Sequence, residues 1–171
     1  MTEAARPHRT AAVLTVSDRG SRGESVDTAG PAVAALLEGA GFEVVARALV
    51  PDEPDDIEGH LLSWADGLEV ALALTAGGTG LSPRDRTPEA TERVIDYLVP
   101  GIPEAIRAAG RASTPMAMLS RGLAGVRGRM LIINLPGSER GATESLRAVL
   151  DMLPHALDQL RGGDHESSGA E

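Results

Sequence analysis

Short apolar runs alternate with segments of helical periodicity along the chain. Runs of aliphatic and β-branched residues predict buried strands at residues 11–16, 42–50, 69–75 and 129–135. Helical patterning and helix start signals predict helices at 28–38, 54–66, 88–98, about 102–111, about 115–124 and about 142–160. Strands that alternate with helices predict a three-layer αβα fold of the α/β class, in which a mostly parallel sheet lies between two helical layers.

The length and the terminal segments predict a single domain. A chain of 171 residues can bury one sizeable core, and a second domain would be crowded. Residues 1–9 lack the apolar core of a signal peptide and predict an N-terminal arm, residues 10–161 predict the domain, and the polar residues 162–171 predict a disordered tail. No run approaches the ~18 apolar residues that a membrane span needs. We therefore expect a cytoplasmic protein with no membrane partner.

A polar or glycine-rich segment follows each predicted strand. In chain order these segments read SDRGSRGESVDTAG, PDEPDD, AGGTGLSPRDR and PGSERGA. Ligands of open parallel sheets bind outside the carboxyl ends of the strands. Unusual loops after every strand therefore predict one shared binding site at this edge of the sheet.

The loop after the third strand has the composition of an anion and metal site. Gly77, Gly78 and Gly80 lack Cβ atoms, so their backbone amides can approach a ligand, and the next helix adds the free N–H groups of its first turn. Arg84 adds local positive charge, and Asp85 can hold a divalent cation that bridges phosphate oxygens. An ordinary strand-to-helix turn remains an alternative at this point, because the spacing matches neither a Walker loop nor a dinucleotide fingerprint.

The composition excludes several other kinds of site. Only Phe42, Trp64 and Tyr97 are aromatic and the formal net charge is -9, so we expect no nucleic-acid partner. The absence of cysteine excludes disulfides, thiolate metal sites and cysteine nucleophiles. The four histidines have no ligand spacing relative to one another. An anionic ligand must therefore be attracted by local groups.

Several motifs together resemble one known family. The segment TAGGTGLSPRDRTPEA at 75–90 is similar to the signature of the molybdopterin-binding family of molybdenum cofactor biosynthesis proteins. VLTVSDRGSRGESVDTAGP at 13–31, VPDE at 50–53, TPMAMLSR at 114–121 and GVRGRMLIINLPGS at 125–138 fit the same family in order. The match runs from about residue 10 to 160, and the chain resembles the single-domain Mog and MoaB-type members.

The resemblance implies an activity and an assembly. It implies a homotrimer that transfers AMP from Mg-ATP to the terminal phosphate of molybdopterin, releases pyrophosphate and hands its product to the molybdenum-insertion protein. Asp85 would bind Mg²⁺ and act in catalysis, with Asp52 as the second catalytic carboxylate. The implied binding residues are Ser17 and Asp18 on the pterin side, Gly77, Gly78, Thr79 and Gly80 with Arg84 at the phosphates or nucleotide, and Pro136, Gly137 and Ser138 as a second cradle.

Two other functions would keep the same glycine loops. One is a molybdopterin-binding carrier of the same family without catalysis, and the other is a generic nucleotide-binding α/β protein. Adenylyl transfer needs no serine, cysteine or histidine nucleophile, since the substrate phosphate attacks and catalysis rests on positioning and charge neutralisation. The presence of Asp52 beside the Arg84-Asp85 pair favours the enzyme.

Overall fold

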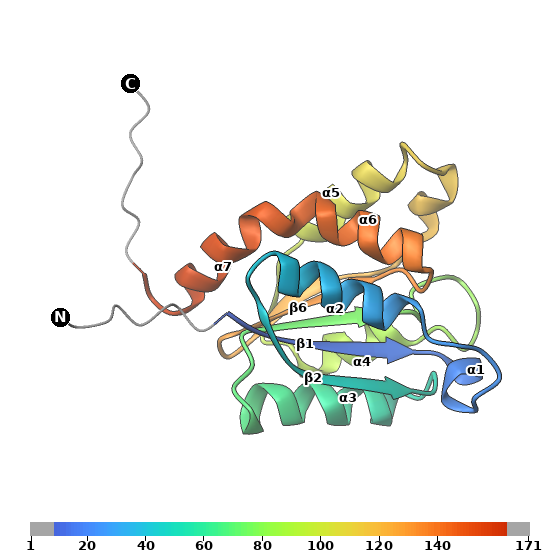
Figure 1. The fold of residues 1–171 in the computed structure, drawn as a ribbon, viewed down its shortest axis with the longest axis horizontal. Helices are drawn as coiled ribbons and strands as arrows, with labels where there is room; N and C mark the ends of the chain where they lie inside the picture. The colour runs from blue at the N-terminus through green and yellow to red at the C-terminus, as the bar shows by residue number, and fades with distance from the viewer. Residues whose placement is uncertain (1–8, 164–171) are drawn as a thin grey trace.

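A computed structural model of the chain describes residues 9–163, which form one six-stranded sheet between two helical layers (Figure 1). The strand order is β2-β1-β3-β6-β5-β4. The strands are β1 (Thr10–Val16), β2 (Glu43–Val50), β3 (Leu72–Ala76), β4 (Tyr97–Leu98), β5 (Ala124–Arg127) and β6 (Met130–Leu135). β2, β1, β3 and β6 are parallel, and β5 and β4 add an antiparallel edge. The predicted α/β architecture is thus confirmed.

Helices cover both faces of the sheet. One layer holds α2 (Ala29–Gly39), α5 (Gly101–Gly110), α6 (Glu139–Val149) and α7 (Leu153–Leu160); the other holds α3 (Pro54–Leu62), the π-helical turn η1 (Ser63–Gly67) and α4 (Thr87–Val94). The short elements α1 (Asp18–Ser21), η2 (Pro115–Leu119) and η3 (Leu150–Met152) complete the chain. No helix within residues 9–163 is long and apolar enough to cross a membrane. Residues 1–8 of the predicted arm and 164–171 of the predicted tail lie outside the described residues.

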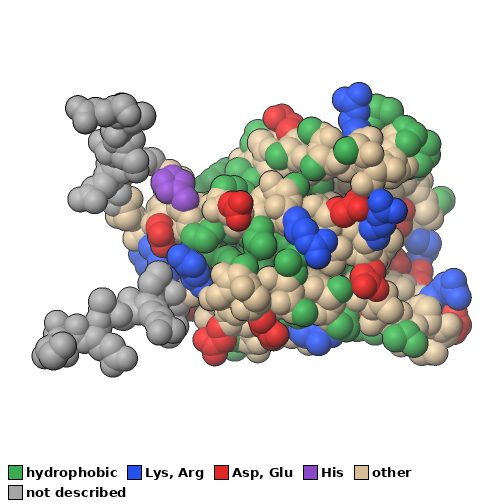
Figure 2. Space-filling model, turned by 45° about the horizontal axis from the view of Figure 1, so that its top comes forward, with side chains coloured by type: hydrophobic (Ala, Val, Ile, Leu, Met, Phe, Trp, Pro, Cys, Tyr) green, Lys and Arg blue, Asp and Glu red, His purple; other side chains and the backbone are tan. Residues whose placement is uncertain are grey.

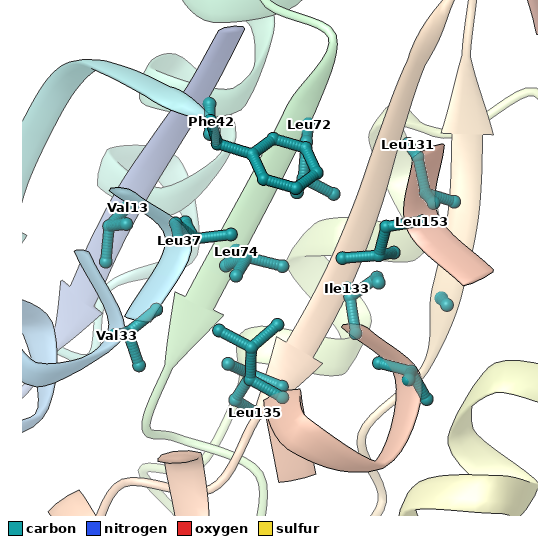
Figure 3. Close-up of a cluster of buried hydrophobic side chains, with 14 of the residues drawn as sticks. Val13, Val33, Leu37, Phe42, Leu72, Leu74, Leu131, Ile133, Leu135 and Leu153 are labelled. Atoms are coloured by element: carbon teal, nitrogen blue, oxygen red, sulfur yellow. The ribbon is translucent and has the colours of Figure 1, made fainter. Parts of the chain in front are cut away.

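The core consists of two clusters, one on each face of the sheet. In β1, Ala11 and Val13 contact the α2–α6 side while Ala12 and Leu14 contact the α3–α4 side. Figure 3 shows Leu74 and Leu135 between the helical side chains of the α2–α6 side. Because side chains alternate between faces along a strand, a strand that is covered on both sides is apolar throughout. This explains the uninterrupted apolar runs in the sequence.

The antiparallel edge was not predicted. The helix expected over 88–98 ends at Val94, because Ile95 is extended and the Asp96 amide donates to the Val126 carbonyl at 2.7 Å. The helix expected over 115–124 is only the 3₁₀ turn η2, followed by β5. Pairing with β6 through the turn at Gly128, where φ is +56°, places 124–127 in the sheet. Long-range strand pairing therefore overrides local helical patterning here.

Two further predicted helices are interrupted. The expected helix 54–66 changes from α to π geometry after Leu62. The expected helix 142–160 begins earlier, at Glu139, and is broken by η3 between α6 and α7. Pro154 lies in the first turn of α7, where its missing N–H costs no internal helix hydrogen bond.

The parallel strands all end at one edge of the sheet. In the register, Val16 of β1 lies beside Val50 of β2, and Ala76 of β3 lies beside Leu135 of β6. Figure 2 shows acidic and basic side chains interspersed over the helices at the top of Figure 1, so positive charge is not gathered in one patch on that face. An anion at the edge of the sheet would therefore depend on the groups of the four loops there.

Candidate functional site

Glycines allow three of these loops to touch one another. Gly77 has φ +112°, and a Cβ on it would lie 2.2 Å from the Val16 carbonyl oxygen at the end of β1. Its amide donates to the Leu135 carbonyl at 3.1 Å. A Cβ on Gly137 would lie 3.2 Å from the Cα of Gly77. Only glycine at 77 lets the ends of β1, β3 and β6 meet this closely.

The first of two cavities at this edge, called the polar cavity here, has a volume of about 370 Å³. It lies among the loops after β1, β2 and β3 and takes in Gly137 from the loop after β6. Among the predicted site residues, its lining includes Ser17, Asp18, Asp52, Gly77, Gly78, Asp85 and Gly137. Thr15 and Asp27, which were not among those residues, also line it.

The second cavity, called the apolar cavity here, has a volume of about 470 Å³ and lies on the other side of the same loops. Its apolar lining comes largely from α5 and η2, with Ile106, Met116 and Leu119 among it. The predicted residues Thr79, Gly80, Pro136 and Ser138 line this cavity. The glycine loop after β3 and the 136–138 segment therefore form a common wall between two compartments, which suits a protein that holds two substrates side by side.

A reciprocal pair of hydrogen bonds joins the ends of β1 and β2 in the polar cavity. The Asp18 amide donates to Asp52 Oδ2 at 2.9 Å, and the Asp52 amide donates to Asp18 Oδ1 at 3.0 Å. Ser17 supports the turn, since its Oγ accepts from the Gly20 amide at 3.0 Å as the cap of α1. Main-chain amides thus hold both carboxylates in fixed orientations.

Arg84 is engaged by acidic side chains at the rim of the polar cavity. Its Nε and Nη2 donate to the two Asp18 carboxylate oxygens at 3.0 and 2.9 Å, and Nη2 lies 2.9 Å from Glu53. The hydrogen bond from Arg84, helped by the Asp52 amide, lowers the pKa of Asp18 to about 2. In this structure Arg84 therefore neutralises the acidic rim, and its predicted contact with substrate stays a prediction.

Asp52 and Asp85 are the two carboxylates that fit a divalent cation. Burial, and then the charges of Asp18 and Asp85, raise the pKa of Asp52 above its ordinary value. Oδ2 of Asp52 accepts from the Asp18 amide, and Oδ2 of Asp85 accepts from the Ser82 amide. Oδ1 of each carboxylate is left to bind a metal. Within residues 9–163 no group of three or more acidic or histidine side chains forms a complete metal site. This donor set fits Mg²⁺, which commonly takes one or two carboxylates and completes its shell with substrate phosphates and water.

Asp27 and Thr15 extend the polar cavity beyond the predicted residues. Thr15 Oγ1 donates to Asp27 Oδ2 at 2.7 Å, and Asp27 Oδ1 accepts from the Gly30 amide at 2.9 Å. A Cβ on Gly30 would lie 2.4 Å from Thr15 Oγ1, so glycine is required there for this contact. The sequence shows that Asp27 stands where it could cap α2. It does not show that Thr15 of β1 donates a hydrogen bond to Asp27.

Comparison with known proteins agrees with this geometry. A family model described as "Probable molybdopterin binding domain" matches residues 12–155. The Drosophila melanogaster protein named Molybdenum cofactor synthesis protein cinnamon is 41% identical over 154 residues, which are 89% of this chain but only 25% of that protein. The Helicobacter pylori protein named Molybdopterin adenylyltransferase is 40% identical over 156 residues, covering 88% of this chain and 86% of its own length.

A solved structure extends the likeness to the fold. The crystal structure of the molybdopterin biosynthesis enzyme MoaB from Thermus thermophilus is 57% identical and superposes with a TM-score of 0.85. The likeness covers 90% of this chain and 96% of that one. The sequence match over most of the chain, the shared six-stranded architecture and the glycine loops lead to one conclusion. The chain belongs to the molybdopterin-binding family of molybdenum cofactor biosynthesis proteins.

Proposed function

We propose that the protein is a molybdopterin adenylyltransferase that uses Mg-ATP. The observation that carries this proposal is the pair of adjoining cavities, which share the glycine loop after β3 as a wall. Both substrates have a ring system at one end and phosphate at the other. One ring system in each cavity would bring the phosphates together at the shared wall, where Asp52 and Asp85 lie.

The reaction forms one bond and breaks one bond at the α-phosphorus of ATP. An oxygen of the terminal phosphate of molybdopterin attacks, a new phosphorus–oxygen bond forms, and the bond to pyrophosphate breaks. The amides of Gly78 and Gly80 would hold the phosphates in line for this attack. The first turn of α4 adds little, because the Thr87 amide donates to the Gly78 carbonyl and Pro88 has no N–H. Asp52 and Asp85 would hold Mg²⁺, which when bound would offset the negative charge of the phosphates. The protein therefore needs to orient the reacting groups and offset their charge, and it provides no nucleophile of its own.

Several features of the assembly belong to the same proposal. Following the family resemblance, we propose that the protein acts as a homotrimer in the cytoplasm and passes the adenylylated pterin to the protein that inserts molybdenum. The non-catalytic carrier is the second candidate. It would need the two cavities and the glycine loops, but it would not need both Asp52 and Asp85 beside them.

The test is product formation by the purified protein. With molybdopterin, ATP and Mg²⁺, we expect adenylylated pterin and pyrophosphate in equal amounts, separated and quantified by chromatography. Asp85→Ala should retain pterin binding and the folded state but lose about 10²-fold or more in turnover, because the carboxylate holds the metal and its loop contributes little to the core. Pterin binding without product in the unmodified protein would leave the carrier as the function, and full activity of Asp85→Ala would remove Asp85 from the mechanism.

A further inference from the structure

The position of Asp85 depends on a loop that makes few contacts of its own. This loop, residues 80–85 and called the aspartate loop here, is exposed from Leu81 to Arg84. Its internal hydrogen bonds are those of the Asp85 and Ser82 amides, at 2.9 and 3.2 Å, which close a small turn. Such a turn sets the conformation of Asp85 relative to the loop. The side chain of Arg84 ties the tip of the loop to Asp18 and Glu53, but it does not hold the main chain at either end of the loop.

Arg121 holds the main chain of the aspartate loop. Its Nε donates to the Gly80 carbonyl at 2.8 Å and its Nη2 donates to the Asp85 carbonyl at 2.7 Å. These carbonyls are the first and the last of the aspartate loop, so one planar guanidinium joins both ends. The Arg121 amide adds a bond to the Thr79 carbonyl at 2.8 Å. A rigid fork of donors holds two fixed acceptors with less loss of freedom than a flexible ammonium would.

The guanidinium is itself anchored on α4. Its Nη1 donates to Glu89 Oε1 in the first turn of the helix. Burial alone would raise the pKa of Glu89, but this hydrogen bond holds that pKa below its ordinary value. Within residues 9–163, the other carboxylate oxygen of Glu89 is buried without a hydrogen-bond partner. The charge of Arg121 therefore neutralises a half-buried carboxylate, and this ion pair keeps the side chain in place behind the loop.

We propose that Arg121 is a positioning residue, which fixes the Asp85 carboxylate at the metal site by holding both ends of the aspartate loop. The catalytic part of this statement rests on the proposed adenylyl transfer. Arg121 lines neither the polar nor the apolar cavity. Its effect on the reaction must therefore pass through the aspartate loop that carries Asp85, and its loss should lower turnover more than it weakens substrate binding.

Arg127 offers a closely matched control. Its guanidinium also makes three hydrogen bonds, to both carboxylate oxygens of Asp66 at 2.9 and 2.6 Å and to the Val94 carbonyl at 2.9 Å. The exposed fractions of the two side chains are similar, at 35% for Arg121 and 28% for Arg127. Arg127 anchors the opposite end of α4, and its three hydrogen bonds go to Asp66 and Val94, which lie outside the aspartate loop. Arg127→Ala thus removes an equivalent clamp at a distance from the site.

Hydrogen exchange tests the attachment without any activity. In Arg121→Ala the Ser82 and Asp85 amides should exchange at least about tenfold faster than in the unmodified protein, because the loop opens without its clamp. Arg127→Ala should leave both rates unchanged. Arg121→Ala also leaves Glu89 without its ion-pair partner, which could destabilise the fold. Arg121→Lys is therefore the second variant. It should keep the ion pair and the melting temperature, yet still accelerate exchange in the loop. Unchanged exchange in both Arg121 variants would overturn the proposal.

Steady-state kinetics test the consequence for catalysis. We expect kcat of Arg121→Ala to fall by about 10²-fold, the effect of a displacement of about 1 Å at a catalytic group, with KM for both substrates changing far less. Arg127→Ala should retain normal kcat. Full kcat in Arg121→Lys would show that charge alone suffices, which would overturn the positioning role. A lack of adenylyl transfer in the unmodified protein would defeat the proposed function alone, because the exchange data judge the attachment independently.

Discussion

Substitution of Gly80 by alanine should separate activity from stability. A Cβ at position 80 would lie 2.8 Å from Asp85 Oδ2, about 0.6 Å short of an ordinary contact. Among the residues that the structure describes, the atoms in the way belong to the Asp85 side chain, so the carboxylate must move while the backbone can stay. A displacement of this size at a catalytic group corresponds to a loss of roughly 10- to 10²-fold in kcat.

The stability of Gly80→Ala should change little. Gly80 does not have a positive φ, so alanine fits the backbone, and the reduced freedom of the unfolded chain contributes about 0.4–1 kcal/mol in favour of folding. The contact with Asp85 offsets part of this gain. We therefore expect a free energy of unfolding within about 1 kcal/mol of the unmodified protein.

The assay combines denaturant unfolding with steady-state adenylyl transfer. Gly59→Ala is the control, because Gly59 lies within α3 and a new Cβ there would meet no atom of residues 9–163 within 4 Å apart from its chain neighbours and the backbone of its own helix. It should stabilise the protein by about 0.5–1 kcal/mol with normal kcat. The reasoning would be refuted if Gly80→Ala kept full kcat, or if it lost kcat only in proportion to a loss of folded protein.

The remaining predictions concern acid pH. The pKa of Asp18 is lowered from 3.8 to about 2, first by Arg84 and then by the Asp52 amide, so the ionised carboxylate stabilises the fold above pH 3.8 and this contribution is lost as the pH falls through about 2. Unfolding curves should therefore show a stability difference between the unmodified protein and Arg84→Ala that is constant above about pH 5 and falls steadily as the pH drops toward 2, and a difference as large at pH 2 as at pH 6 would contradict the assignment. The pKa of Asp52 is raised by burial and by its acidic neighbours, so the ionised form that the proposed metal site needs is lost at a higher pH than in an ordinary aspartate. We expect the acid limb of kcat/KM, which reports the free enzyme, to lie above 3.8, and a limb at or below that value would exclude Asp52 as its source.

The central part of the fold could be predicted from the sequence because it is dominated by local pattern and burial. β1 and β3 are covered on both faces, so their apolar runs are continuous and their positions are evident. The edge strands differ. Tyr97 and Leu98 of β4 are exposed, and this two-residue strand exists only through pairing with β5. Such pairing depends on residues far away in the chain and leaves no periodic signal in a short segment.

The candidate site could likewise be predicted only in part. The glycine loops and Asp85 could be predicted as a group because their residue types are unusual together, and the edge of the sheet brings them to adjoining cavities. The division into two cavities could not be predicted, since η2 and α5 supply the second wall. Arg84 appeared to be a ligand for an anion, yet in the structure it binds Asp18 and Glu53. Arg121 could be recognised only from coordinates, because its acceptors are carbonyls that every residue type shares.

The central claim is that Asp52 and Asp85 hold a divalent cation at the wall between the two cavities. The most direct measurement is a crystal structure with a non-hydrolysable ATP analogue and Mn²⁺ in place of Mg²⁺, with Mn²⁺ located by anomalous scattering. We predict one Mn²⁺ bound by the Asp85 and Asp52 carboxylates and by nucleotide phosphate oxygens, with the phosphates against the amides of Gly78 and Gly80. Nucleotide bound in either cavity with Mn²⁺ remote from both carboxylates would contradict the account.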